Sequence, residues 1–270
     1  MKNMRLMSIL AVVLLSLTNC KKEDKGSVPP PAKISPIIVA EMNTPIYGKL
    51  TATWCGPCGA WGWTLNDEVI AAIETKAIPM GLYGSNTSNF TNATVNKWFT
   101  DFGGKSYPNF TVNGTNKTAF SSNGGIYTTT TKTDVLAAVD NFIATPVQAS
   151  AGGNLTWAGQ TLSVKSAVKY FINQTGDFYI GAYMIENKAK SIQNSQVGEV
   201  EHHYVCRGSM SADVYGVKYA GALTAGTQTE LTDFTFDVPS TWIKENISVA
   251  IIIWKKVGAS YTFVNAAKIK

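Results

Sequence analysis

Two cysteines separated by two residues constrain the fold of this chain more than any other feature of its sequence. They are Cys55 and Cys58, and the five residues from 54 to 58 read Trp-Cys-Gly-Pro-Cys. Apolar and β-branched residues from Ile46 to Thr53 predict a strand before the pair. Apolar residues recur at helical spacing from Ala60 to Lys76, which predicts a helix after it. We therefore expect the pair at a strand-to-helix junction, where free backbone N–H groups favour a thiolate.

The spacing of this pair is found in redox sites, zinc sites and structural disulfides, and other features of the sequence distinguish them. Two thiols this close can form a disulfide and reopen it by exchange. A zinc site needs further ligands, but the chain has no second C-x-x-C or C-x-x-H, and its two histidines are adjacent. A structural disulfide gains little stability from closing so short a loop. The pair therefore indicates redox chemistry, and we expect no metal and no cofactor.

The motif at residues 54–58 resembles the active site of thioredoxins, and the residues that follow agree with that family. The segment from Tyr107 to Gly114 resembles the thioredoxin cis-proline loop, followed by a strand and a turn. The other elements predicted in this half are a strand over 77–83, a helix over 94–102 and a closing helix over 132–143. The resemblance implies an α/β thioredoxin-like domain over residues 37–146, with residues 85–93 as a loop insertion.

The resemblance implies a role for each residue of the motif. Cys55 would be the exposed nucleophile, and Cys58 would be the buried thiol that resolves the mixed disulfide. Pro108 in cis would pack against the pair, and Tyr107 would line a groove for an extended substrate segment. The residues that would support the active site are Trp54, Gly56, Pro57, Tyr107 and Pro108.

Lys49 departs from the thioredoxin pattern, which has a buried acid six residues before the first cysteine. A charged lysine cannot accept a proton from the second thiol, and near the thiols it would favour a thiolate. The alternative is a strand residue whose amine reaches solvent. Glu41, Asp67 and Glu68 are candidate replacement acids, and the sequence does not choose among them.

After residue 146 the periodicity changes from that of helices to that of short strands. The segments that read as strands are 162–172, 178–186, 231–238, 247–254 and 261–268. Turns are predicted at Gly152-Gly153, Ala158-Gly159, Thr175-Gly176-Asp177 and Gly258-Ala259. This pattern predicts an all-β, immunoglobulin-like antiparallel sandwich domain over residues 147–270.

Four neighbouring residues of the second half have side chains that can carry chemistry. His202 and His203 would point to opposite faces of a strand, so we interpret them as structural or surface residues. Cys206 is interpreted as a small buried residue, and the alternatives are a third redox partner and a thiol that pairs between molecules. Arg207 is expected in a plain surface ion pair, and the alternative is a carboxylate bound across a domain interface.

The N-terminus has the pattern of a bacterial secretion signal. The apolar run 6–17 follows a short basic segment and is too short to span a bilayer. Residues 17–20 read Leu-Thr-Asn-Cys and resemble a lipobox, so 1–19 is interpreted as a lipoprotein signal peptide and Cys20 as the site of lipid attachment. Residues 20–36 would then be a lipid-anchored tether. Ordinary secretion and an uncleaved anchor are the alternatives.

The order of these parts resembles the outer membrane protein 28 family of lipid-anchored bacterial proteins, and so does the segment 201–208. The resemblance implies a lipoprotein of the cell envelope, held to the outer membrane through Cys20 and either periplasmic or surface-exposed. With only two arginines and no basic cluster, the chain is not expected to bind nucleic acid.

Two functions are compatible with the sequence. The first is a thiol–disulfide oxidoreductase that reduces or isomerises protein disulfides with the dithiol of Cys55 and Cys58. Its partners would be protein disulfide substrates and a membrane electron donor. The second is a non-enzymatic outer-membrane lipoprotein, in which the sandwich binds a partner and the thioredoxin-like domain is a scaffold.

Overall fold

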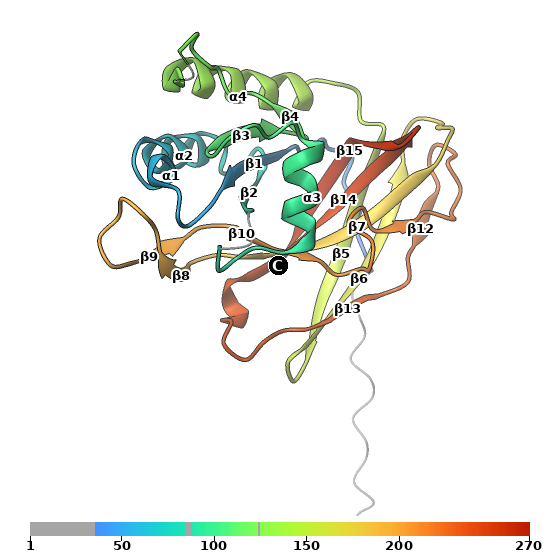
Figure 1. Cartoon of the computed structure of the whole chain (residues 1–270). Coiled ribbons are helices and arrows are strands. Elements are labelled where there is room, and N and C mark those ends of the chain that lie inside the picture. The colour runs from blue at the N-terminus through green and yellow to red at the C-terminus, as the bar shows by residue number, and fades with distance from the viewer. Residues whose placement is uncertain (1–35, 85–87, 124) are drawn as a thin grey trace, which may run out of the picture. The chain divides into compact units, whose positions relative to one another are not determined.

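The computed structural model describes residues 36–84, 88–123 and 125–270. The predicted signal peptide, Cys20 and the tether up to residue 35 lie outside this range, as do residues 85–87 of the predicted loop insertion. The described residues form a mixed α/β structure with large β-sheets (Figure 1). Within the described ranges, no helix combines the length and the apolar character needed to cross a membrane.

The structure contains helices mainly in its first half and strands throughout. The helices are α1 (Gly56–Gly59), α2 (Trp61–Ile73), α3 (Ala93–Asp101) and α4 (Thr128–Ile143), with a 3₁₀ turn η1 at Lys244–Asn246. The strands of the first half are β1 (Ile46–Thr51), β2 (Ile78–Tyr83), β3 (Asn109–Val112) and β4 (Thr115–Asn116). The longer strands of the second half are β5 (Ala149–Ala158), β6 (Thr161–Tyr170), β7 (Phe178–Glu186), β14 (Ile247–Val257) and β15 (Ser260–Ile269). The shorter ones are β8 (Ala189–Ile192), β9 (Glu199–His202), β10 (Val205–Ser209), β11 (Val217–Lys218), β12 (Gln228–Glu230) and β13 (Phe234–Asp237).

One nine-stranded sheet contains strands from both halves of the chain. Its order is β15-β14-β7-β10-β2-β1-β3-β4, and β11 pairs with β7. Strand β1 is parallel to β2 and antiparallel to β3. Strand β10 lies parallel to β2 through the pair of Val205 and Gly81, and antiparallel to β7 on its other side. A strand from the second half therefore completes the sheet beside β2, which the sequence did not indicate.

The second half adds a smaller sheet that shares a core with the larger one. Strands β5, β12 and β13 all pair with β6 in this four-stranded antiparallel sheet. Apolar residues alternate along β6, and β7 and β14 are apolar at nearly every position, so each sheet turns an apolar face to the other. The core between them includes Leu162, Val164, Val168, Ile180, Met184, Val249 and Ile251. The described residues fall within one compact unit, and the division into two domains at residue 146 stays a prediction.

The predicted turns of the second half are confirmed except for one. The turns at Ala158-Gly159, Thr175-Gly176-Asp177 and Gly258-Ala259 each connect two consecutive strands, and their glycines have positive φ angles. The turn predicted at Gly152-Gly153 is wrong, because both residues lie inside β5. A Cβ atom at Gly152 would lie 2.3 Å from the carbonyl oxygen of Ile38. Close approach of another backbone segment, and not a bend, therefore requires glycine here.

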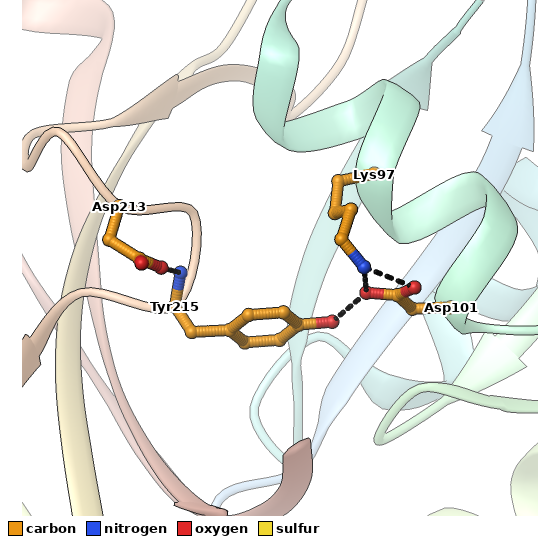
Figure 2. A network of polar contacts seen from close by, with 4 residues as sticks. All are labelled: Lys97, Asp101, Asp213 and Tyr215. Carbon is orange, nitrogen blue, oxygen red and sulfur yellow. Dashed lines mark hydrogen bonds and ion pairs between the residues drawn. The ribbon is translucent and has the colours of Figure 1, made fainter. Parts of the chain in front are cut away.

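Helix α3 is fixed to the second half by the polar network of Figure 2. Asp101 accepts a hydrogen bond from the Tyr215 hydroxyl (2.5 Å) and another from Lys97, one helical turn earlier (2.6 Å). Asp213 in turn accepts a hydrogen bond from the backbone N–H of Tyr215 (2.8 Å). Trp98 of the same helix is fully buried, and its ring centroid lies 4.7 Å from that of Tyr183 on β7. These contacts fix the helix that leads into the segment of Tyr107.

Candidate redox site

Cys55 and Cys58 form a disulfide directly after β1. Their Cα atoms are 5.3 Å apart, and the Cys55 Sγ atom accepts a hydrogen bond from the Cys58 N–H (3.2 Å). Cys55 is the N-cap of α1, which is a single turn because the backbone leaves helical geometry at Ala60 before α2 begins. Pro57 lies in that first turn, where its missing N–H leaves no hydrogen bond unmade. The predicted strand-to-helix junction is confirmed, with a break between two helices.

Aromatic residues lie beside the disulfide. Trp54 is 48% exposed, and its ring meets the Tyr107 ring edge-on at 5.8 Å. The Tyr107–Pro108 peptide bond is cis, as the resemblance implies. Pro108 is buried against the start of α2, where a Cβ atom on Gly62 would lie 2.7 Å from its ring. Tyr107 also packs against the small buried cluster of Ala52, Cys55 and Cys58.

The hairpin of β8 and β9, which was not predicted from the sequence, covers one flank of the cysteine turn. Its connecting residues 193–198 bind the backbone around the disulfide. The N–H of Asn194 donates to the Thr53 carbonyl (2.8 Å), and the Gln193 side chain donates to the Cys55 carbonyl (3.0 Å). The two strands are short and carry mixed residues, so no periodicity marks them in the sequence.

Gly59→Ala is expected to break the contact between α1 and this hairpin. An added Cβ atom would lie 1.9 Å from the Asn194 carbonyl oxygen, a backbone atom that cannot rotate away. We expect a loss of about 1–3 kcal/mol in the free energy of unfolding, as for other overpacked sites. The exchange of the Asn194 amide with deuterium should also accelerate.

Gly56→Ala is the matched control for that variant. Its added Cβ atom would lie 3.4 Å from the Ser195 Oγ atom, which is ordinary contact with the same loop. The exchange of the Asn194 amide should therefore stay unchanged in this control. Equal exchange rates in the two variants would contradict the close packing of Gly59.

Lys49 lies on β1 beneath the cysteine turn and is only 4% exposed. Its Nζ atom donates to the Cys58 carbonyl (3.3 Å) and lies 5.3 Å from the centre of the Trp63 ring. Burial lowers the pKa of Lys49 to about 7, and the negative charge of Asp67 opposes this shift. The alternative in which the amine reaches solvent is wrong, because helix α2 covers this face of the sheet.

Of the three candidate acids, Asp67 is the one that shares a cavity with Lys49. Asp67 itself is exposed on α2. Glu68 forms a surface ion pair with Lys132 (2.8 Å), and Glu41 is exposed in the segment before β1. The position of the thioredoxin acid is thus taken by a buried amine, with a carboxylate at the surface nearby.

The histidines are structural residues, as predicted. His202 is fully buried, with its Nδ1 atom 2.8 Å from the Tyr83 hydroxyl, and burial lowers the pKa of its ring to about 4. His203 lies just outside β9, and its Nδ1 atom is 2.9 Å from the Asn187 side-chain oxygen. The described part of the chain contains no group of three or more His, Cys, Asp or Glu residues placed to hold a metal ion.

Cys206 lies in the core of the protein and not in the redox site. Its thiol is free and fully buried, and burial raises its pKa to about 12. A thiol that stays protonated at neutral pH is a poor nucleophile. The interpretation of Cys206 as a small buried residue is therefore confirmed.

Arg207 forms an ion pair that is buried, and not at the surface as the sequence predicted. Its Nε atom donates to the Glu186 carboxylate (2.7 Å), and the two side chains are 13% and 5% exposed. The guanidinium carbon lies 4.7 Å from the centre of the Phe90 ring and 4.4 Å from that of Trp242. The pair joins β10 to β7 within the second half, so the predicted plain surface pair is wrong.

Comparisons with known proteins identify a similar fold. No protein family model and no curated protein matches the chain. Among solved structures, it is similar to HBP35 of Porphyromonas gingivalis, with a TM-score of 0.66 and 17% identity over 85% of this chain and 75% of that one. A match to the E. coli curli protein CsgC covers 44% of this chain and 94% of that one at 9% identity, and its TM-score of 0.20 is too low to indicate a shared fold.

The comparison therefore supports the fold, and the structure adds a cysteine pair at disulfide distance in a C-x-x-C spacing. At 17% identity, the similarity to HBP35 indicates a common fold and says nothing about activity. Membership in the outer membrane protein 28 family is not confirmed.

Proposed function

We propose that the protein is a cell-envelope thiol–disulfide oxidoreductase that acts on protein disulfides with Cys55 and Cys58. The observation that carries this proposal is the disulfide between them in a C-x-x-C spacing, directly after β1. The cis bond before Pro108, in a segment that packs against the pair through Tyr107, supports it. In this proposal β1 to β4 and α2 to α4 form the thioredoxin-like part, and the later strands form an immunoglobulin-like sandwich.

The reaction takes place in two steps that begin from the reduced pair. The Cys55 thiolate attacks one sulfur of a substrate disulfide, and the other substrate sulfur leaves as a thiolate. Cys58 then attacks the Cys55 sulfur, which re-forms the protein disulfide and releases the second substrate thiolate. Two electrons pass from the cysteine pair to the substrate. The expectation that Cys55 is exposed is wrong for the oxidised pair, since Cys55 is only 4% exposed and Cys58 is fully buried. The order of attack therefore follows the resemblance to thioredoxins.

The proposal includes the location and the partners of the protein. The chain is held to the outer membrane by acyl groups on Cys20, after removal of residues 1–19, and residues 20–36 are its tether. It is either periplasmic or surface-exposed. Its substrates are proteins with disulfides, and a membrane protein returns electrons to the cysteine pair. The lipobox-like residues 17–20 support this part of the proposal.

The decisive test is to trap mixed disulfides in cells that express the full chain. A Cys58→Ser variant should retain substrate proteins on Cys55, because nothing resolves the mixed disulfide. On a non-reducing gel it should show adducts that disappear on reduction. A Cys55→Ser variant should show none, and Cys206→Ser should behave like the natural chain. An equal set of adducts in both active-site variants would contradict the proposal.

A second candidate is a non-enzymatic lipoprotein in which the sandwich binds a partner. The observation that favours it is the near-complete burial of the disulfide, together with the hairpin that binds its backbone. If this candidate is correct, the Cys58→Ser variant traps no proteins, and reduction of the pair leaves partner binding unchanged.

A further inference from the structure

We propose that Lys49 accepts the proton of the Cys58 thiol when the mixed disulfide is resolved. The proton then leaves through a small polar cavity that Lys49 shares with Asp67. This inference rests on the proposed function, because it concerns the second of the two steps. It assigns to a buried amine the proton transfer for which the sequence offered three candidate acids.

The burial of Cys58 makes a protein group necessary for this transfer. Cys58 has no exposed surface, so bulk water cannot take the proton of its thiol directly. The thiolate is the species that attacks a disulfide, and the proton must therefore move before or during the attack. The Nζ atom of Lys49 is bonded to the carbonyl of this same residue (3.3 Å). This contact places the amine next to the residue that must lose its proton.

The surroundings of Lys49 leave its amine able to accept a proton. In the described residues, no carboxylate forms an ion pair with it, and Trp63 lies against its Nζ atom. A buried cation with no counterion is disfavoured, so the neutral amine is present at neutral pH and above, in agreement with a pKa of about 7. A neutral amine donates through its N–H groups to the Cys58 carbonyl and still has a free lone pair.

The other titratable groups that face Lys49 do not replace it. Tyr47 on β1 itself and Tyr83 on the neighbouring β2 have pKa values raised by burial, so both stay protonated at neutral pH. His202 from β9 is neutral because its pKa is lowered to about 4, and its Nδ1 atom is engaged with Tyr83. Asp67 from α2 is exposed and acts on the lysine at longer range.

A small cavity lies beside the amine, and its lining includes the exposed residue Asp67. Its volume is about 10 Å³, which is close to the space that one water molecule needs. Polar groups line it on several sides, and a water molecule in such a space finds the partners that it requires. The lining residues include Lys49, Tyr47, Trp63, Asn66, Asp67 and His203. Because Asp67 is exposed, a proton that reaches its end of the cavity has reached solvent.

The step balances without any further reactant. The S–H bond of Cys58 breaks, and the proton goes to the Lys49 Nζ atom, which leaves a thiolate and an ammonium group. The thiolate forms a bond to the Cys55 sulfur, the bond between Cys55 and the substrate sulfur breaks, and its electron pair leaves with the substrate thiolate. The substrate disulfide is the oxidant. The ammonium group then releases its proton to water in the cavity.

The test is the pH dependence of the resolving step in the full chain. The reduced protein is mixed with the aromatic disulfide dithiobis(nitrobenzoate), whose coloured thiolate is released once at each step. The first step is measured separately in a Cys58→Ser background. In the natural chain we expect the resolving rate to rise with pH through a midpoint near the Lys49 pKa of about 7 and then level off.

Lys49→Met should slow the resolving step and leave the first step unchanged. A loss of about 10²-fold near pH 7.5 is expected for the removal of a general base. The remaining rate should rise only where the Cys58 thiol ionises by itself. Asp67→Asn should move the midpoint of the natural profile to lower pH, since the Asp67 charge raises the pKa of Lys49. Lys132→Met, on the surface of α4, is the control and should change neither step.

Lys49→Arg separates proton transfer from a simple charge effect. An arginine stays charged and cannot accept a proton, so we expect it to resolve as slowly as the methionine variant at pH 7.5. An arginine variant as fast as the natural chain would overturn the proposal in favour of a fixed positive charge. An unchanged pH profile in Lys49→Met would also overturn it. If the natural chain forms no mixed disulfide with the probe, the proposed function itself fails.

Discussion

Replacing Lys49 by methionine is expected to stabilise the protein by an amount that depends on pH. The folded chain lowers the pKa of this lysine from 10.5 to about 7. Between these pH values the unfolded chain binds a proton that the folded chain does not, so the stability of the natural protein rises with pH. The destabilising effect of the lysine is complete below pH 7 and is lost gradually above it.

The stability gap between the Lys49→Met variant and the natural chain should therefore be largest at pH 7 and below. A shift of this size corresponds to on the order of 5 kcal/mol, and the gap should shrink by about 2 kcal/mol between pH 7 and pH 9. Urea unfolding of the oxidised proteins at several pH values measures it. Lys132→Met removes an exposed lysine and should show no such trend. A gap independent of pH would mean that Lys49 keeps its charge in the folded chain.

Glu186→Leu is expected to destabilise the protein by about 3–5 kcal/mol, because it leaves a buried charge without its partner. The guanidinium of Arg207 lies between the rings of Phe90 and Trp242, with its side chain 13% exposed. Without the carboxylate, the cation has neither water nor a counterion around most of its surface. The free energy of unfolding in urea at neutral pH measures the loss.

The matched control for this variant is the exposed pair of Lys76 and Asp140. Their side chains are 50% and 57% exposed, and Asp140→Leu should change stability by about 1 kcal/mol or less. Replacing both Glu186 and Arg207 by leucine should recover much of the lost stability, since no buried charge then remains. A loss from Glu186→Leu no larger than that of the control would show that solvent still reaches Arg207.

The sequence predicted the elements whose residues carry a clear local pattern. Strand β1, helices α2 to α4 and strands β7, β14 and β15 all lie close to their predicted bounds, because their apolar residues follow one period over a sufficient length. The junction that holds the cysteine pair followed from the same patterns. The cis bond before Pro108 followed from the resemblance to thioredoxins.

The parts that were not predicted depend on contacts between distant segments. Strand β10 is short and contains Cys206, Arg207 and a glycine, so its place beside β2 cannot be recognised from its own residues. The hairpin loop that binds the Cys55 carbonyl through Gln193 carries no local signal either. The burial of Lys49 could have been predicted better, since a short, mostly apolar strand such as β1 is typical of a strand covered on both faces.

The place of β10 in the large sheet constrains how this protein folds during synthesis and how its two halves can evolve. Residues up to 146 contain Cys55 and Cys58. Strand β2 can pair on its outer side only after residues 205–209 of β10 have been synthesised. Until then a newly made chain presents an open strand edge, which is a template for pairing with other chains. Gene fusions that exchange one half for another would expose the same edge. The half that contains the cysteine motif and the half that contains β10 are therefore expected to have evolved together.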